Sequence, residues 1–504
     1  MKIKNLLFKN TAINGLFRIS SITVNFLLMP FIIHHIGIAR FGIFIVVQVI
    51  VGSFGIFSEA IRSSILKHVS QYHSENNPPK MNSLISSVFF SFLIFGIISF
   101  LILLLLGTFI ITRFFNIDPY LLGEARHSLI IVSFLLIFIF PLRAFEGILQ
   151  GMQRYDLNSY TGWLTITVRT TAILFILKMG FGLIPLILVI YSAEIICHLL
   201  NIYFVKHVIP FLDIKVSNIN REMLKIIYGF VSIMFLIKIF GLINTKMDQI
   251  IISIFINVSS VTYYEAANRL HMLLMSLTGL MTAAIVPAAS YLYTERNFAT
   301  LKTLLLRGNK YLQAIILPVA ISIIFMAKPF LNRWLGAEFE SVAIVAQIFV
   351  IYWLFHISLG VSAAILTGMG RIKFILFYFM SIAICNLFLS IIFVTKFYLG
   401  LVGVAIGTAI PHIIGAPFFL MYALKAISVP WKGFLKATIL KTYPIALVVS
   451  LLLFLLISQS YPKSMLHIGL YAMFTFTIYL LLFYLFGLNK NERSEAIAKL
   501  SLKI

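Results

Sequence analysis

The segment ILQGMQR at residues 148–154 has a close copy, ILTGMGR, at residues 365–371. Five of the seven positions are identical, and the two segments lie 217 residues apart. A second pair of similar segments, SQYHSENN at 70–77 and SYLYTERN at 290–297, is separated by 220 residues. Two matches with nearly the same spacing predict that the chain contains two structurally related halves.

The composition indicates an all-α polytopic membrane protein. Hydrophobic residues make up 61% of the chain and charged residues 11%, and the mean hydropathy is +1.03. Apolar runs of about 20 residues, the length needed to cross a bilayer as a helix, recur along the chain. The sequence has no phosphate-binding loop of the G-x-x-x-x-G-K-[ST] type and no His/Cys cluster with metal-ligand spacing, so we expect no cofactor.

About fourteen segments are predicted to span the membrane, with short connections between them. The predicted spans are residues 11–33, 41–60, 83–112, 127–149, 158–177, 183–204, 227–254, 264–288, 309–327, 342–366, 373–395, 400–424, 436–458 and 466–487.

Lysine and arginine are concentrated in alternate connections. Roughly three times as many lie in the two termini and the even-numbered connections as in the odd-numbered ones, which predicts that both termini are cytoplasmic. This bias explains most of the net charge of +23 without a nucleic-acid partner. Six spans per half give both halves the same orientation, so we predict a pseudo-two-fold axis along the membrane normal. The expected parts are a six-helix lobe at 1–215, a second six-helix lobe at 216–430, and two extra spans with a cytoplasmic tail at 431–504.

Several ionisable residues fall inside predicted spans, where each costs about 2.5–3.5 kcal/mol on insertion scales. Arg269 follows Glu265 at i,i+4 spacing, which leaves open whether the two form a local ion pair or part of a cavity. The polar stripes on the first two spans of each half predict a cationic cavity, because arginine can hold two phosphate oxygens at once. The candidate substrate-binding residues are Arg18, Asn25, Arg169, Lys238, Asp248 and Arg269, and the candidate ion-coupling residues are Asp248, Glu194 and Glu265.

Three stretches, residues 4–44, 145–160 and 245–270, carry a resemblance to a known family. The last has the pattern Asp-x-x-Ile-x-x-x-Phe followed by Tyr-x-x-Ala, which begins at Asp248 and at Tyr264. In these stretches the chain resembles bacterial lipid-linked oligosaccharide flippases of the polysaccharide-transport type. That family belongs to the superfamily that also contains lipid II flippases and MATE multidrug exporters.

The resemblance implies a transporter, not an enzyme, in the bacterial inner membrane. It implies that undecaprenyl-pyrophosphate-linked repeat units, the precursors of O-antigen or capsule, are flipped by alternating access. The cationic lining would hold the pyrophosphate while the lipid tail stays among membrane lipids. H+ or Na+ as a coupling ion, and a polysaccharide polymerase with its chain-length machinery, are the further partners that this reading suggests.

Two other functions are weighed against this one. A multidrug or other amphiphile exporter of the same superfamily would need acidic cavity residues for cationic drugs, whereas the first span offers Arg18 and no carboxylate. A membrane glycan polymerase or ligase would resemble chains with a large extracytoplasmic loop, and the predicted outer loops here are short.

Overall fold

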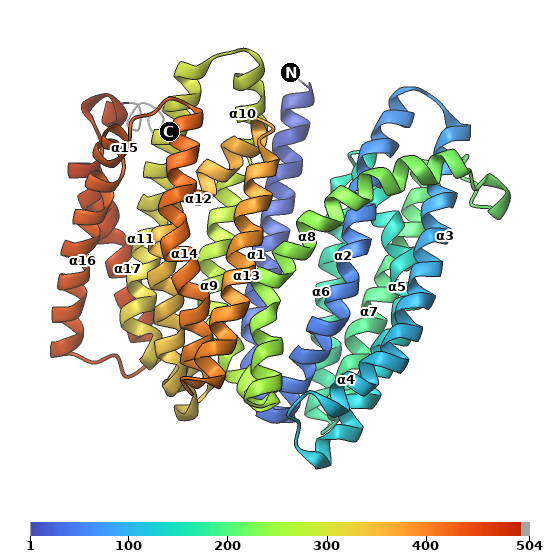
Figure 1. Cartoon of the computed structure of the whole chain (residues 1–504), viewed down its shortest axis with the longest axis horizontal. Helices are drawn as coiled ribbons and strands as arrows, with labels where there is room; N and C mark the ends of the chain where they lie inside the picture. Colours follow the sequence, from blue (N-terminus) through green and yellow to red (C-terminus); the bar gives the residue numbers. More distant parts are fainter. Residues whose placement is uncertain (1, 495–504) are drawn as a thin grey trace. The chain divides into compact units, whose positions relative to one another are not determined.

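The computed structural model describes residues 2–494, apart from the side chains of residues 2–12, 14, 230, 233, 234, 236 and 237. This part of the chain consists of helices and turns and contains no β-strand (Figure 1). It forms two compact units, Met1–Thr262 and Tyr263–Ile504. The prediction of an all-α polytopic protein is confirmed.

The first unit contains α1 (Lys2–Ile36), α2 (Ile38–Ser74), α3 (Pro78–Ile102), α4 (Thr108–Arg113), α5 (Leu122–Gly151), α6 (Tyr155–Lys178), α7 (Leu183–Val208) and α8 (Arg221–Phe255). The second contains most of α9 (Val258–Thr282), then α10 (Ile285–Thr294), α11 (Phe298–Leu335), α12 (Ala343–Gly368), α13 (Ile372–Thr395), α14 (Gly400–Ala426), α15 (Trp431–Ala437), α16 (Ile439–Gln459) and α17 (Met465–Leu482). The short helices are η1 (Leu103–Gly107), η2 (Pro119–Leu121), η3 (Val216–Asn218), η4 (Ala337–Val342) and η5 (Phe483–Gly487).

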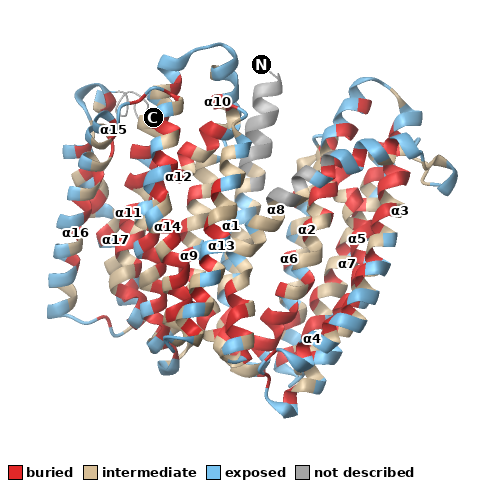
Figure 2. Ribbon diagram, viewed as in Figure 1, coloured by how far each residue is buried: buried red, intermediate tan, exposed pale blue. Residues whose placement is uncertain are grey.

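Thirteen helical segments in the described part of the chain are long and apolar enough to cross a membrane. They correspond to thirteen of the predicted spans, and the remaining one, residues 227–254, lies within α8. Many apolar side chains on the outer faces of the helices are exposed, for example Leu105 at 68% and Leu447 at 65% (Figure 2). Such exposure suits a surface that contacts lipid tails.

The same pattern of helix packing occurs in both units. In the first unit α5 packs against α2, α3 and α7, and α6 packs against α7. In the second unit α12 packs against α10, α11 and α14, and α13 packs against α14. The compact units divide after Thr262, with α8 packed on α2 and α3 in the first. The predicted lobe boundaries, 1–215, 216–430 and 431–504, stay a prediction.

The copied segments at 148–154 and 365–371 form the same turn at the ends of α5 and α12. In the first copy the N–H of Arg154 donates to the carbonyl of Leu149 at 2.8 Å. In the second the N–H of Arg371 donates to the carbonyl of Leu366 at 2.9 Å. The residue before each arginine has a left-handed backbone, with φ of 58° and 74°. Each turn closes the end of its helix with a backbone hydrogen bond.

The second pair of copied segments also forms matching turns, between α2 and α3 and between α10 and α11. The side chain of Asn77 accepts the N–H of Lys80 at 3.1 Å, and that of Asn297 accepts the N–H of Thr300 at the same distance. Each asparagine therefore caps the helix that follows it. The residue before each asparagine has a positive φ, 48° and 54°.

In each unit a glycine at the end of one helix brings these turns together. A β-carbon on Gly151 would lie 2.8 Å from the β-carbon of Val69, which immediately precedes the segment 70–77. A β-carbon on Gly368 would lie 2.7 Å from the carbonyl oxygen of Val286 and 2.8 Å from the nitrogen of Ser290. Larger residues at the two glycines would force the helices apart.

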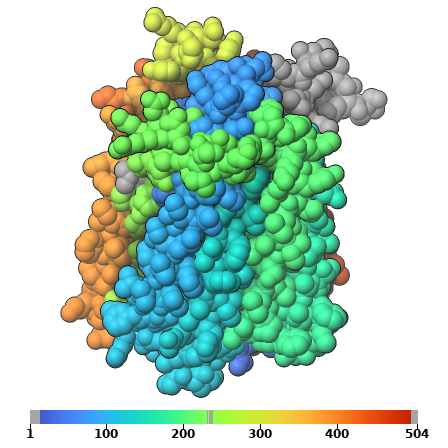
Figure 3. Space-filling view, turned by 90° about the vertical axis from the view of Figure 1, so that its right-hand side faces the viewer, coloured from blue at the N-terminus to red at the C-terminus, as the bar shows by residue number. Residues whose placement is uncertain are grey.

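The connection between α7 and α8 is held against the N-terminal end of α3, and both lie on the face that Figure 3 shows. Asn82 of α3 donates to the carbonyl of Phe211 at 3.2 Å and accepts the N–H of Asp213, also at 3.2 Å. Ser86 accepts the N–H of Lys215 at 3.3 Å. With these hydrogen bonds, side chains of α3 satisfy backbone polar groups of the α7–α8 connection.

Cysteine labelling tests the predicted orientation. Tyr120 and Tyr291 are 76% and 67% exposed and lie at ends that the charge bias assigns to the periplasm and the cytoplasm, respectively. In a Cys197→Ser/Cys385→Ser background, an impermeant maleimide should label Tyr120→Cys in right-side-out spheroplasts. Tyr291→Cys should be labelled only after the membrane is permeabilised. Labelling of Tyr291→Cys in sealed spheroplasts would show the orientation to be reversed.

Candidate functional site

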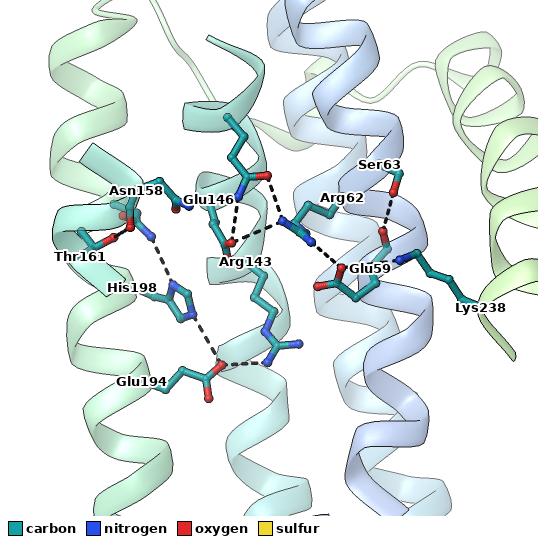
Figure 4. A network of polar contacts seen from close by, with 12 residues as sticks. Glu59, Arg62, Ser63, Arg143, Glu146, Asn158, Thr161, Glu194, His198 and Lys238 are labelled. Atoms are coloured by element: carbon teal, nitrogen blue, oxygen red, sulfur yellow. Dashed lines mark hydrogen bonds and ion pairs between the residues drawn. The ribbon is translucent and has the colours of Figure 1, made fainter. Parts of the chain in front are cut away.

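The first unit contains a network of charged side chains that extends from α2 through α5 to α7 (Figure 4). Arg143 of α5 places Nη2 2.9 Å from Oε1 of Glu194 on α7, and less than a third of either side chain is exposed. His198, one turn after Glu194, holds Nε2 3.6 Å from the same oxygen. A lone charge is costly in an apolar layer, so each partner stabilises the other there.

Arg62 of α2 forms the other part of this network. Its guanidinium lies 2.5 Å from the carboxylate of Glu59 and 3.5 Å from that of Glu146 on α5. Its Nη1 also donates to Oε1 of Gln150 at 2.9 Å. Lys238 of α8 places Nζ 3.9 Å from Oε2 of Glu59. Together with the pair described above, three basic groups face three carboxylates, so the network is balanced in charge.

A cavity of about 230 Å³ lies beside the network, between α1, α5, α6 and α7. Its lining includes the hydroxyl and amide groups of Ser21, Asn158, Thr161, Thr165 and Asn201. Two carboxylates of the network, one histidine and one arginine complete the polar lining. Hydroxyl, amide and carboxylate groups can exchange hydrogen bonds with sugar hydroxyls, and a guanidinium can donate to phosphate oxygens.

Two arginines of the first unit, unlike those in the network, do not form an ion pair with a described carboxylate. Arg169 lines the cavity, and its Nη2 donates to Oδ1 of Asn25 on α1 at 2.8 Å. None of the described carboxylates lies within ion-pair distance of Arg169. Arg18 is exposed on α1, three residues before Ser21, and makes neither a hydrogen bond nor an ion pair within the described part of the chain. Three residues expected from the sequence, Arg18, Asn25 and Arg169, thus lie on two helices that pack together.

Among the expected site residues, Arg169 and Glu194 line this cavity. Arg18, Asn25, Lys238, Asp248, Glu265 and Arg269 are not among its lining residues. Asp248 on α8 is 8% exposed, and Lys238 reaches Glu59. Nε of Arg269 lies 3.4 Å from Oε1 of Glu265, so these two residues form a local ion pair, one of the two interpretations that the sequence left open. Lys238 and Asp248 belong to the first unit and Arg269 to the second, so a cleft lined by all three stays a prediction.

Arg143 and Glu146 are not among the site residues expected from the sequence, although both fall inside the predicted span 127–149. The signal that points to Arg18 would also have found them, because an ionisable residue in an apolar span needs a partner. Which partner it finds depends on the packing of α5 against α2 and α7, and no local pattern reveals that.

Removing either partner of the Arg143–Glu194 pair should destabilise the protein. Arg143→Met and Glu194→Gln should each cost about 3 kcal/mol, because each leaves a charged partner half-buried. The double variant should cost clearly less than the sum. The melting temperatures of the purified variants measure these effects.

Arg154→Met is the matched control, because Arg154 pairs with Asp156 at 3.0 Å while more than 40% of each side chain is exposed. Its cost should stay below about 1 kcal/mol. Additive effects in the double variant, or an equal loss in the control, would contradict the interpretation of Arg143 and Glu194 as mutually dependent charges.

Comparisons with known proteins agree with the helical architecture. Residues 7–292 match the family of polysaccharide biosynthesis proteins. The uncharacterized membrane protein EpsK of Bacillus subtilis (strain 168) is 22% identical over 423 residues, which cover 83% of either chain. The structure resembles the lipid II flippase MurJ in an inward closed conformation, with a TM-score of 0.72 at 17% identity over 95% of this chain and 98% of that one.

A multidrug resistance transporter of the MATE family in the MOP superfamily, in an inward-facing conformation, gives a TM-score of 0.69. Its identity is also 17%, and the match covers 82% of this chain and 98% of that one. Likeness at this level of identity shows a common fold. The family match covers more than half of the chain, and the protein therefore belongs to the polysaccharide biosynthesis protein family.

Proposed function

We propose that this protein is a flippase that carries undecaprenyl-pyrophosphate-linked oligosaccharide repeat units across the bacterial inner membrane by alternating access. The observation that carries the proposal is membership of the polysaccharide biosynthesis family by a chain built of membrane-spanning helices. Surface polysaccharides such as O-antigen or capsule need a step that moves a lipid-linked precursor between leaflets. A helical membrane protein with the fold of a lipid II flippase suits that step.

The cavity of the first unit supports a polar, anionic substrate. Its hydroxyl and amide lining suits sugar hydroxyls. Arg169 and Arg18 are the basic groups of this region that are not matched by a described carboxylate. In the proposed complex they bind the pyrophosphate, because a guanidinium can donate two parallel hydrogen bonds to phosphate oxygens. Asn25 holds Arg169 in place for this role.

We propose that a coupling ion, H+ or Na+, acts at one of three acidic side chains on the helices, Asp248, Glu194 and Glu265. Glu194 and Glu265 each lie beside an arginine, at 2.9 and 3.4 Å, so an ion would compete with that arginine for the carboxylate. Asp248 is buried on α8.

A multidrug exporter is the second candidate, because the MATE transporter shares the fold. The carboxylates that line the cavity argue against a cationic drug. Glu146 lies 3.5 Å from Arg62, and Glu194 lies 2.9 Å from Arg143. Both negative charges are thus already compensated within the protein, whereas two arginines remain for an anion.

Replacing Arg18 or Arg169 by alanine should reduce surface glycan by about tenfold or more when the variant replaces the wild-type protein in its own host. Losing one charge-assisted hydrogen bond should weaken substrate binding by about 1.5–3 kcal/mol, which corresponds to about tenfold or more. Lysine at either position should give an intermediate level, because the charge stays but the paired hydrogen bonds are lost. Surface glycan and the amount of protein in the membrane are measured together.

Lys178→Ala is the control, because Lys178 is exposed at the end of the same helix as Arg169 and does not line the cavity. Wild-type glycan levels in both alanine variants, with normal protein in the membrane, would refute the cationic site. Normal glycan in a strain that lacks the protein, together with raised sensitivity to cationic drugs, would favour the exporter instead.

A further inference from the structure

A second polar cavity lies in the second unit, between α11, α15, α16 and the residues that follow η5. Its volume is about 600 Å³. The lining residues come from the N-terminal part of α11, the α15–α16 junction and residues 489–492 of the tail, so the cavity lies at one end of these helices. The charge bias of the sequence assigns this end to the cytoplasm.

Four basic residues line this cavity, and the carboxylate of Glu492 is the acidic group among its described lining residues. The basic residues are Arg307 and Lys310 of α11, Lys436 of α15 and Lys441 of α16. Nζ of Lys310 lies 2.5 and 2.6 Å from the two carboxylate oxygens of Glu492, and both side chains are 5% exposed. Nε of Arg307 lies 3.8 Å from the same carboxylate.

The carboxylate of Glu492 is itself an anionic group held in this cavity. Besides the contact with Lys310, its Oε2 accepts the N–H of Asn489 at 2.9 Å. Burial alone would raise the pKa of Glu492, but the Lys310 ammonium, the Asn489 N–H and the Arg307 charge together hold its pKa below the ordinary value. The carboxylate is therefore ionised and occupies one part of the cavity.

The remaining part of the cavity keeps an excess of positive charge. Lys436 is exposed and Lys441 half-buried, and neither forms an ion pair within the described residues. The described lining holds four basic groups and one carboxylate, and the two lysines lie outside the ion pairs of that carboxylate. A cavity of this size with such a charge excess suits a phosphate group.

An exposed apolar helix face begins beside this charge. Leu440 is adjacent to Lys441 and 63% exposed, and Leu447 and Leu451, on the same face of α16, are 65% and 57% exposed. Figure 2 shows exposed residues along the length of this helix. A ligand that has both an anionic head and acyl chains would contact the lysines and this face together, whereas a free phosphate ion would use the lysines alone.

We infer that the cavity formed by α11, α15, α16 and the tail binds the phosphate of an anionic phospholipid headgroup from the leaflet that the charge bias assigns to the cytoplasmic side. Lys436 and Lys441 contact the phosphate oxygens, and the acyl chains lie along α16. The site is separate from the cavity of the first unit, and the inference does not depend on the proposed transport function. The tail contributes Glu492, which pairs with Lys310 and Arg307 and leaves Lys436 and Lys441 to the lipid.

The test uses the purified full-length protein in detergent and measures the binding of short-chain phosphatidylglycerol. Lys436→Gln/Lys441→Gln should weaken binding by roughly 25-fold, about fivefold for each lysine. The control Lys425→Gln/Lys432→Gln removes the same charge from exposed residues that do not line the cavity, and it should leave the affinity within about twofold. Phosphatidylcholine, whose headgroup has no net charge, should bind much more weakly to the wild-type protein. Equal losses in the two double variants, or no preference for phosphatidylglycerol, would overturn the site.

Inorganic phosphate separates the two sources of the anion. If it displaces phosphatidylglycerol at similar concentrations and protects the protein equally against thermal unfolding, the site binds free phosphate and the lipid assignment is wrong. Glu492→Gln provides a change in the opposite direction, because it adds one net positive charge to the cavity. Phosphatidylglycerol should then bind about fivefold more tightly, and weaker binding by a folded variant would contradict the inference.

Discussion

In each unit, one glycine lets two helix ends come into close contact. Lipid tails are as apolar as leucine, so helices in a membrane are held together mainly by close packing and by polar contacts. Gly151 lets the end of α5 approach α2 at Val69, and Gly368 lets the end of α12 approach α10 at Ser290. The neighbouring turns match in their hydrogen bonds and in the sign of φ. The arrangement of the other helices in each unit is consistent with these two contacts.

The polar interior of the first unit follows from this packing. Once α5 lies between α2 and α7, Arg143 faces Glu194 and Glu146 faces Arg62. The four charges could not be retained in an apolar layer without one another. The result is a balanced network beside a cavity whose remaining arginine, Arg169, is held by an amide of a neighbouring helix. A network whose charges cancel, next to the guanidinium of Arg169, suits the recognition of an anion.

The sequence predicts much of the fold and part of the site. The apolar periodicity predicted the spans, and the copied segments at 148–154 and 365–371 proved to be equivalent turns. Arg18, Asn25 and Arg169 were expected from their polar helix faces, but the hydrogen bond between Asn25 and Arg169 joins residues 144 positions apart and has no sequence signature. Arg143 and Glu146 were not expected, although both are ionisable residues in a predicted span; which partners they find depends on tertiary packing.

The ion pair between Lys310 and Glu492 connects residues 182 positions apart, nearly at the end of the chain. The two residues are therefore synthesised at different times. Helix α11 leaves the ribosome and enters the membrane long before Glu492 has been made, so Lys310 lacks this partner while the five described membrane-spanning segments that follow are inserted. The second unit can reach its final charge balance only after Glu492 has been synthesised. The last residues of the described chain therefore complete the folding of a helix that was inserted much earlier.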